Sequence, residues 1–381
     1  MRIEFPDYNN CCVNLMNSVA KHFGLKAEHN TLPIVDKELQ KGYKNVVVLI
    51  LDGLGQHILM NRFPKDSFLR QNFAQELSAV YPSSTVPATV SFKTGLTPLQ
   101  HAWWGHFLYF KDLGQTINLY TNNDAFSRKK VAIDDVAHKV MPYSNILDKA
   151  CEVDKNLHAY TLVPAEARDN FGVFQVTYND LTEMADYIET LTSLPDKRLI
   201  YAYYNEPDDT MHKFGNDSNE SAKLLNDINY IVENMCTRCK DTLFLITADH
   251  GQTILHESRD ITNYPDFLNT IHQMPVGCTR CAGFYVKRGR EKEFVKLAKK
   301  YFGDKFAIFS KSEVLKKNLL GYGEMHPELD NVLGDYLLCA TDDCNITYST
   351  IYGKPKLNPI GIHGGLTLEE MRVPLIIYGN K

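Results

Sequence analysis

The 381-residue chain lacks both a membrane-length hydrophobic run and an excess of basic charge. No apolar segment approaches the roughly 20 residues that a bilayer-spanning helix needs, so a membrane partner is not expected. Lysine and arginine number 41 against 46 acidic residues, a formal net charge of −5. Without a basic field, a nucleic-acid polymer is not expected as the main partner. The chain also lacks internal repeats and low-complexity linkers, which argues against a solenoid.

Residues 1–24 lack the features of a secretory signal peptide, namely a basic segment, an apolar segment and a small-residue cleavage site. They have the spacing of an amphipathic helix instead, with an apolar face made of Val13, Leu15, Met16, Val19 and Phe23. Nine cysteines without an export signal predict reduced thiols and a cytoplasmic protein.

Two CxxC pairs, Cys236 with Cys239 and Cys278 with Cys281, have identical interiors. Four thiolates would suit a structural zinc ion. The gap between the pairs is well beyond the usual zinc-ribbon interval, so free thiols are the preferred interpretation.

Apolar residues make up 44% of the chain and charged residues 23%, a globular composition. Strand-like and helical patterns alternate along most of it, and continuous apolar runs such as Val46–Leu51 suit strands that are covered on both faces. The expected strands are Val46–Leu51, Ile117–Tyr120, His158–Val163, Leu199–Tyr204, Leu243–Thr247 and Val373–Tyr378. The expected helices lie near His57–Met60 and at Asp180–Leu191, Asn219–Met235 and Thr367–Met371. We therefore predict an α/β fold with a mostly parallel sheet sandwiched by helices.

More than a hundred residues between His250 and His363 depart from this alternation. They predict strands at Phe284–Lys287, Phe306–Phe309, Tyr336–Ala340 and Asn345–Ser349, and helices at Glu291–Tyr301 and at Ser312–Leu319, with Ser312 as N-cap. We interpret residues 256–357 as a small α+β cap inserted into a core formed by residues 1–255 and 358–381.

Acidic and histidine residues follow the strand-like runs of the core. They are Asp52, Asp208, His212, Asp249, His250 and His363. Each alone is a weak indication, but ligands of open α/β sheets bind at the carboxyl ends of the strands, where these residues would converge. Imidazole suits zinc, and carboxylate also tolerates manganese. The set predicts two divalent metal ions, zinc first and manganese as the alternative.

Thr85, in the segment PSSTVP, is a candidate nucleophile and a seventh metal ligand. Two metals can clamp the attacking and leaving oxygens of an in-line displacement, and a coordinated threonine hydroxyl is activated without a histidine base. Two dications against three carboxylates leave a positive site, which favours an anionic phosphoryl substrate. The alternative role for Thr85 is the N-cap of a helix that continues through Pro87–Lys93, and the two roles are compatible.

The ordered motifs resemble those of the type I phosphodiesterase/nucleotide pyrophosphatase family of the alkaline phosphatase superfamily. They are DGLG at Asp52–Gly55, the segments Pro82–Pro98 and Glu206–Gly215, TADHG at Thr247–Gly251, and IHGG at Ile362–Gly365. The resemblance implies an alkaline-phosphatase-like fold and a zinc ion held by Asp208, His212 and His363. It also implies a second zinc ion held by Asp52, Asp249 and His250, and a Thr85 that becomes phosphorylated.

His106 departs from the family pattern, which has an asparagine there that binds a non-bridging phosphate oxygen. A neutral histidine donates one hydrogen bond, whereas a protonated one would favour a more negative phosphate. The alternative is that His106 packs in the core with Trp103 and Trp104. These two tryptophans are also candidate substrate contacts, as a platform for a ring, with core packing as their alternative.

We therefore expect a hydrolase that cleaves a small phosphorylated substrate, a diester or pyrophosphate, through a phosphothreonine intermediate. A phosphomonoesterase is the first alternative, supported by His106. A phosphomutase on the same scaffold would need basic phosphate clamps, and no arginine cluster is evident. A silent binding module would be expected to have lost at least one ligand.

Overall fold

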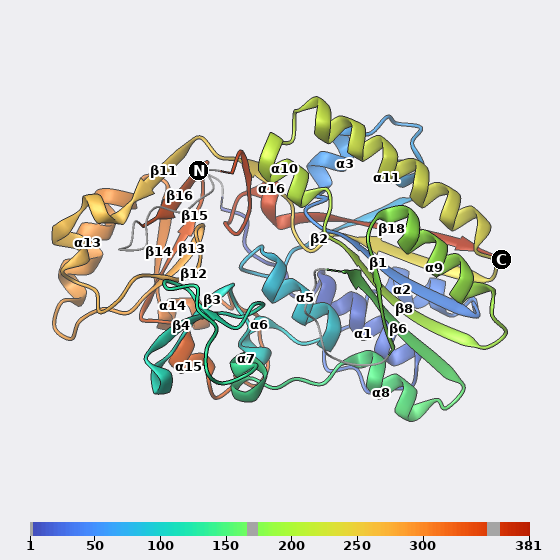
Figure 1. Ribbon diagram of the computed structural model, residues 1–381, viewed down its shortest axis with the longest axis horizontal. Helices are drawn as coiled ribbons and strands as arrows, with labels where there is room; N and C mark the ends of the chain where they lie inside the picture. Colours follow the sequence, from blue (N-terminus) through green and yellow to red (C-terminus); the bar gives the residue numbers. More distant parts are fainter. Residues whose placement is uncertain (1–2, 166–173, 349–358) are drawn as a thin grey trace.

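The computed structural model describes residues 3–165, 174–348 and 359–381, arranged as two lobes that each contain a seven-stranded sheet (Figure 1). The first sheet has the order β2 (Phe73–Ser78), β18 (Arg372–Asn380), β9 (Thr242–Thr247), β1 (Asn45–Leu51), β8 (Lys197–Tyr204), β6 (Leu157–Pro164) and β7 (Phe174–Tyr178). The second has the order β14 (Phe306–Ser310), β15 (Tyr336–Ala340), β13 (Cys281–Phe284), β12 (Val276–Cys278), β3 (Phe107–Phe110), β4 (Gln115–Asn118) and β5 (Asn123–Asp124).

Strand β1 occupies the centre of the first sheet, and all seven of its residues are buried. It pairs in parallel with β8 on one side and β9 on the other. Strand β18 runs antiparallel to both of its neighbours, so the sheet is mostly parallel, as predicted. In register, Leu51 lies opposite Tyr204 and Ile50 opposite Thr247. The three central strands therefore end at nearly the same level.

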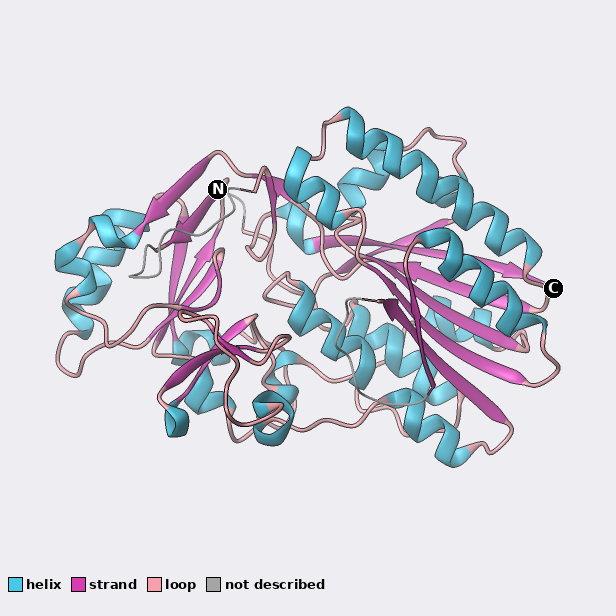
Figure 2. Cartoon of the chain, in the orientation of Figure 1, coloured by secondary structure: helices cyan, strands magenta, loops and turns pink. Residues whose placement is uncertain are grey.

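Helices cover both faces of this sheet (Figures 1 and 2). One group contains α3 (Gln56–Arg62), α4 (Phe68–Gln71), α9 (Leu181–Ser193), α10 (Asp208–Phe214), α11 (Asn219–Arg238) and the short α16 (Leu368–Met371). The other contains α1 (Cys12–His22), α2 (Pro33–Leu39), α5 (Thr85–Thr94) and α8 (Ile146–Val153). Helices α6 (Pro98–His101) and α7 (Val136–Val140) lie nearer the second lobe (Figure 1). The predicted apolar face of α1 is buried, with Val13, Leu15, Met16 and Val19 each 0% exposed. Every described helix is too short or too polar to cross a bilayer.

The second sheet is antiparallel and draws its strands from two separate parts of the chain. Helices α12 (Pro265–Leu268), α13 (Glu291–Phe302), α14 (Lys311–Lys316) and α15 (Leu329–Val332) belong to this lobe, and α13 packs on a separate apolar core that contains Phe284 and Phe306. Two short strand pairs, β10 (Thr253–Ile254) with β17 (Gly361–Ile362) and β11 (Glu257–Asp260) with β16 (Cys344–Thr347), lie outside both sheets.

The expected strand at Ile117–Tyr120 was placed in the wrong sheet, because β4 lies in the second lobe beside β3 and β5.

The division of the chain into a core (residues 1–255 and 358–381) and a cap (residues 256–357) stays a prediction. The boundary between residues 357 and 358 falls outside the described residues. The second sheet nevertheless combines residues 107–124 with residues 276–340.

Two glycines join these two parts of the second sheet. A Cβ on Gly105 would lie 2.6 Å from the Cα of Gly277, and one on Gly277 would lie 2.5 Å from a ring carbon of Trp104. Gly277 also has φ +90°, a conformation that a side chain disfavours. The close approach lets β12 pair with β3 and buries Trp104 against the pairing.

Helix α14 begins earlier than predicted, because Ser310 and not Ser312 caps it. Ser310 Oγ accepts a hydrogen bond from the Glu313 amide, and the Glu313 carboxylate accepts one from the Ser310 amide at 2.8 Å. Ser310 and Glu313 have the spacing S-x-x-E that this reciprocal capping box needs, whereas the third residue after Ser312 is Leu315.

Strand β13 also begins earlier than the predicted Phe284, because a two-residue turn pairs Cys278 with Cys281.

A fully buried ion pair links the second lobe to the segment that follows β17. Arg280 Nε and Nη2 donate to the two carboxylate oxygens of Glu370 at 2.7 and 2.6 Å, and both side chains are 0% exposed. Glu370 also accepts hydrogen bonds from the amide of Gly365 at 2.8 Å and the hydroxyl of Thr367 at 2.7 Å. Burial alone would raise the pKa of Glu370, but Arg280 holds it below its usual value.

Replacing Arg280 with leucine should lower the free energy of unfolding by about 3–5 kcal/mol, because it leaves the Glu370 carboxylate buried without its cation. Urea denaturation measures this change. The matched control is Arg290→Leu, since Arg290 pairs with Glu293 at the surface and the loss there should stay within about 1 kcal/mol. Equal losses in the two variants would contradict a structural role for the buried pair.

Candidate metal centre and adjoining cavity

Three acidic and histidine side chains follow the ends of the adjacent strands β1 and β9. They are Asp52, Asp249 and His250, all buried. The Nε2 atom of His250 lies 3.3 Å from Asp52 Oδ1 and 3.3 Å from Asp249 Oδ2. Because β1 and β9 pair in register, the two carboxylates meet at one edge of the sheet and form a group with metal-ligand spacing.

A second group gathers around Asp208, which begins α10 directly after β8. His212 lies one turn later on the same helix, with Nε2 3.0 Å from Asp208 Oδ2. His363 Nε2 lies 3.9 Å from the same oxygen. His363 follows β17, outside the main sheet, so it reaches the edge from a separate segment rather than from a sheet strand as expected. The ring of His250 stacks on that of His363 with centroids 3.7 Å apart. His250 has ligand spacing to Asp208 and His363 as well as to Asp52 and Asp249, whereas His212 lies outside both of these sets.

The backbone orients all three histidines in the same way. The Nδ1 atoms of His212, His250 and His363 lie 2.7, 3.0 and 3.1 Å from the carbonyl oxygens of Gly361, Gly251 and Ser83. A carbonyl only accepts, so each Nδ1 carries the proton and each Nε2 presents a lone pair to the site. This tautomer is the one that a metal ligand needs.

The carboxylates leave oxygen atoms unsatisfied in the same space. Asp249 Oδ1 accepts hydrogen bonds from the amides of Gly53 and His250 at 3.1 and 3.0 Å, and Asp52 Oδ2 accepts one from the Tyr203 hydroxyl. The remaining oxygens, Asp52 Oδ1 and Asp249 Oδ2, are buried and accept no hydrogen bond from any described residue. They face the bare Nε2 of His250, an arrangement of lone pairs that a cation would stabilise. The residues present therefore fit divalent metal ions.

The electrostatics of the three carboxylates agree with this fit. Burial, together with the charge of Asp208, raises the pKa of Asp249 to about 6. Burial and the two neighbouring aspartates also raise the pKa of Asp52. For Asp208, burial acts upward, but His363 and His212 hold its pKa below the usual value. Without cations, the protein cannot keep all three groups ionised at little cost.

Thr85 is the first residue of α5, and Ser84, in an extended conformation, is the N-cap. The alternative role of Thr85, as the N-cap of this helix, is therefore wrong. Its hydroxyl is not needed by the helix backbone, and Thr85 Oγ1 lies 3.4 Å from His250 Nε2. The partly exposed Thr85 thus presents its oxygen to the group formed by the metal-ligand residues.

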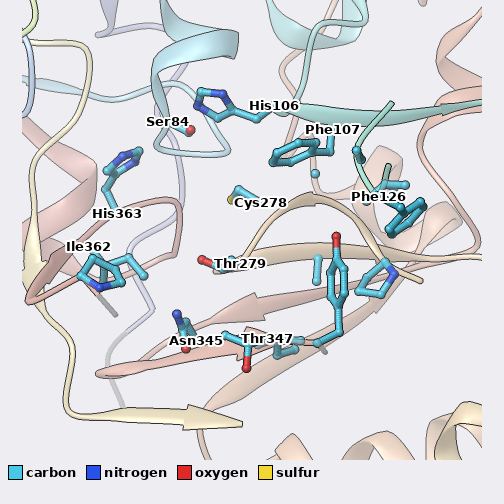
Figure 3. Close-up of a pocket in the computed structure, with 18 of the residues that line it drawn as sticks. Ser84, His106, Phe107, Phe126, Cys278, Thr279, Asn345, Thr347, Ile362 and His363 are labelled. Atoms are coloured by element: carbon cyan, nitrogen blue, oxygen red, sulfur yellow. The ribbon is translucent and has the colours of Figure 1, made fainter. Parts of the chain in front are cut away.

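His106 and the two tryptophans differ in their surroundings. His106 is half-buried and lines a cavity beside Ser84 and His363 (Figure 3). Trp103 and Trp104 are 2% and 0% exposed and do not line that cavity. Their ring nitrogens donate to the carbonyls of Met141 and Val332 at 2.9 and 3.3 Å. Both indoles are thus packed in the core, the alternative stated from the sequence.

The cavity has a volume of about 380 Å³ and extends from the metal edge into the second lobe (Figure 3). Ser84, His106, His212 and His363 line one end. Strands β12 and β16 and the turn after β5 provide much of the rest. A volume above about 300 Å³ is in the range of small-molecule sites.

Sequence reasoning missed two polar residues that position the carboxylates. Tyr203 donates to Asp52, and Gln252 donates through Nε2 to the carboxylate of Asp208 and, at 3.2 Å, to the carbonyl of the same residue. Gln252 directly follows the DHG triplet, so its position at the same edge of the sheet could have indicated its contact with the site.

The two CxxC pairs lie at the end of α11 and in the β12–β13 hairpin, and all nine cysteines are free. The metal-type clusters among the described residues contain no cysteine.

A family model for type I phosphodiesterase/nucleotide pyrophosphatase matches residues 46–366, most of the chain. The chain belongs to this family. As a member of the type I phosphodiesterase/nucleotide pyrophosphatase family it is a hydrolase that acts on phosphoric esters, and the family is metal-dependent. The resemblance predicted from the ordered motifs is thereby confirmed.

Solved structures show the same fold. Human ectonucleotide pyrophosphatase/phosphodiesterase 5 aligns with a TM-score of 0.67 at 16% identity, over 88% of this chain and 87% of that one. The murine protein of the same name aligns with a TM-score of 0.66 at 16% identity, over 88% of each chain. Phosphonoacetate hydrolase from Sinorhizobium meliloti 1021, in complex with phosphonoformate, aligns with a TM-score of 0.60 at 15% identity, over 87% and 89%. At these identities the likeness confirms the predicted alkaline-phosphatase-like α/β fold.

Removing the metals should destabilise the protein more at about pH 7.5 than at about pH 5. The folded-state pKa of Asp249, about 6, lies above its ordinary value, so the metal-free folded state holds a proton that the unfolded state releases. Stability without metal therefore falls as pH rises through this window, whereas bound cations need the ionised form. The measurement is the difference in Tm between metal-loaded and chelator-treated protein.

The Asp249→Asn variant should lose most of this Tm difference at both pH values. Asp209→Asn is the matched control, because Asp209 accepts from Asn205 and lies outside both metal-type groups. A Tm difference that is the same at both pH values would show that Asp249 is not coupled to the metal.

Proposed function

We propose that the enzyme cleaves small phosphodiesters or pyrophosphates with Thr85 as nucleophile, through a phosphothreonine intermediate. Two divalent cations would be held by Asp208, His212 and His363 and by Asp52, Asp249 and His250, zinc first and manganese as the alternative. The observation that carries the proposal is the position of Thr85 Oγ1, 3.4 Å from Nε2 of His250, which has ligand spacing to Asp208 and His363 as well as to Asp52 and Asp249. Thr85 would be a further ligand.

When bound, the two cations supply charge that stabilises the attacking and leaving oxygens. Thr85 Oγ1 gives up its proton and forms a bond to phosphorus as the bond from phosphorus to the leaving oxygen breaks, and the released alcohol or phosphate takes up a proton. Water then attacks phosphorus, the bond to Thr85 Oγ1 breaks, a proton from the water restores the Thr85 hydroxyl, and the phosphate product leaves. Because Thr85 begins α5, amides of the first helical turn are available to non-bridging phosphate oxygens.

His106 supports a diester more than a monoester. Burial first, and then His363 and His250, lower the pKa of His106 to about 4, so the imidazole is neutral at pH 7. A neutral imidazole donates one hydrogen bond, as the asparagine of the family pattern does. The electrostatic argument for a monoesterase, which needs a protonated His106, therefore loses its support.

The other hypotheses have less support. A phosphomutase needs basic clamps, and Arg128 is the only arginine or lysine among the described residues that line the cavity. A silent binding module does not explain why six ligand-type residues and Thr85 share one edge. We also propose a cytoplasmic location, for which the nine free thiols are the support.

Thr85→Ala should lower kcat for methyl p-nitrophenyl phosphate by at least about 10³-fold, because it removes the attacking oxygen. Elemental analysis should still find the metals, since Thr85 is only one ligand of seven. Thr94→Ala is the matched control, because Thr94 lies at the other end of α5 and bonds to the Val90 carbonyl. Near-normal turnover by the Thr85 variant would assign the attack to water.

His106→Ala should lower kcat by about 10²–10³-fold with metal content unchanged, because one donor to the phosphoryl group is lost. His106→Asn should retain most of the activity. With His106 neutral, the ratio of kcat/KM for methyl p-nitrophenyl phosphate to that for p-nitrophenyl phosphate should show no His106-dependent step between about pH 5.5 and 8. A step near the ordinary imidazole pKa in the wild type that is absent from the asparagine variant would show that His106 is cationic.

A further inference from the structure

Two Cys-Thr-Arg-Cys segments occur in the chain, and they fold in different ways. Cys236 and Cys239 lie at the end of α11, where both side chains are buried. Cys278 and Cys281 instead stand opposite each other on β12 and β13, on the two sides of a two-residue turn. The hairpin pair also has a third thiol beside it, because Cys281 is paired with Cys339 on β15.

The strand register places Cys281 closer to Cys339 than to Cys278. The Ala340 amide donates to the Arg280 carbonyl at 2.7 Å, and these two residues lie opposite each other. Because hydrogen-bonded and non-hydrogen-bonded pairs alternate, the next pair, Cys281 with Cys339, is non-hydrogen-bonded. The amide and carbonyl of Cys281 then point to β12, so its pairing with Cys278 is the hydrogen-bonded and wider one.

A non-hydrogen-bonded pair has the spacing that a disulfide needs. Its Cα atoms are about 4.5 Å apart and its side chains approach closely. Disulfides span Cα distances of about 4.4–6.8 Å. Burial, and after it the Cys339 thiol, raise the pKa of Cys281, which is the effect expected of two thiols that face each other. Cys281 and Cys339 can therefore be bridged without moving their strands.

The three thiols differ in their access to solvent. Cys281 and Cys339 are both 0% exposed, so an oxidant has no direct access to them. Cys278 is half-buried and lines the cavity near His363 (Figure 3). A Cβ on Gly364 would lie 2.6 Å from the Cys278 sulfur, so this thiol touches the backbone directly after His363. The thiols thus form a path that leads from the cavity into the second lobe.

We propose that Cys278, Cys281 and Cys339 form a thiol–disulfide relay, in which a small organic disulfide reacts at Cys278 and the oxidation ends as a buried disulfide between Cys281 and Cys339. The inference goes beyond the proposed function and does not rest on it. In a reducing compartment such a disulfide is transient, as in redox-sensing proteins.

Three exchanges move the disulfide inward, each by attack of a thiolate on a disulfide sulfur. Cys278 gives up its proton and bonds to one sulfur of the small disulfide, whose other half leaves and takes up a proton. Cys281 then bonds to the Cys278 sulfur and expels the second small thiol, which takes the Cys281 proton. Finally Cys339 bonds to the Cys281 sulfur, and Cys278 leaves and takes the Cys339 proton. The small disulfide is thereby reduced to two thiols, and Cys281 and Cys339 are oxidised.

The geometry favours the inner disulfide at the end of this sequence. A bond across the wider pairing of Cys278 with Cys281 is more strained and therefore more easily reduced than one across the closer pairing. The inner bond is also buried, out of reach of small thiols. The relay returns Cys278 to its reduced form, so no small thiol stays attached in the cavity beside His363.

The test exposes the folded, metal-loaded protein to bis(2-hydroxyethyl) disulfide and then alkylates all remaining thiols in denaturant. Burial raises the pKa of Cys278 to about 12, so its thiolate is scarce at neutral pH and the exposure lasts several hours. Peptide mass spectrometry should find a disulfide between Cys281 and Cys339, with Cys278 recovered as an alkylated thiol.

Three serine variants stop the relay at different steps. Cys278→Ser should slow formation of the buried disulfide at least about tenfold, because the half-buried entry thiol is gone. Cys281→Ser should keep the mercaptoethanol group on Cys278. Cys339→Ser should accumulate the bond between Cys278 and Cys281. If a variant at a buried position fails to fold, Cys278→Ser still carries the test, because Cys278 lines a cavity.

The other Cys-Thr-Arg-Cys segment provides the internal control, because Cys236 and Cys239 have the same interior but do not line the cavity. Both should be recovered as thiols, and Cys239→Ser should leave formation of the buried disulfide unchanged. The relay is overturned if the wild type forms no disulfide between Cys281 and Cys339, or if the Cys278→Ser variant forms it equally fast. Oxidation of Cys236 and Cys239 at the same rate would also overturn it.

Discussion

The architecture of the site depends on the close approach of three buried carboxylates at the ends of β1, β8 and β9. Their mutual repulsion and their burial raise the pKa values of Asp52 and Asp249, and only the nearby histidines keep that of Asp208 low. Carbonyl oxygens of the backbone hold the protons of those histidines on Nδ1, on the side away from the carboxylates. Such a set of lone pairs is stable only with positive charge among them, which is the condition under which a threonine hydroxyl becomes a useful nucleophile.

The second lobe takes part in building this site. His363 is brought to the edge by the segment after β17, where Ser83 Oγ donates to the carbonyl of Gly365 at 2.8 Å and His363 Nδ1 donates to the carbonyl of Ser83. Glu370 holds the same segment through Gly365 and Thr367 and is neutralised by Arg280 from the second sheet. The candidate metal ligand that lies nearest the C-terminus, His363, is therefore positioned by contacts to both lobes.

Local patterns predicted the strands of the first sheet well, because β1 and β9 are continuous apolar runs that must be covered on both faces. They predicted β4 in the wrong sheet, since a short strand such as Gln115–Asn118 carries no information about its partners. They also placed the helix caps at Thr85 and Ser312 one and two residues too late, because another hydroxyl residue stands just before each of them. Trp103 and Trp104 could not be assigned at all from sequence, because an indole serves a core and a ligand equally well.

The sequence by itself determined the types and order of the candidate ligands and most of the strand ends that carry them. It did so because parallel strands place successive carboxyl ends on one edge whatever lies between them. Only the tertiary structure decided that His363 arrives from outside the sheet, that burial lowers the pKa of His106, and that a cavity opens from the metal edge into the second lobe. These features arise from burial and from contacts between segments hundreds of residues apart. A local sequence pattern predicts neither the burial nor the contacts.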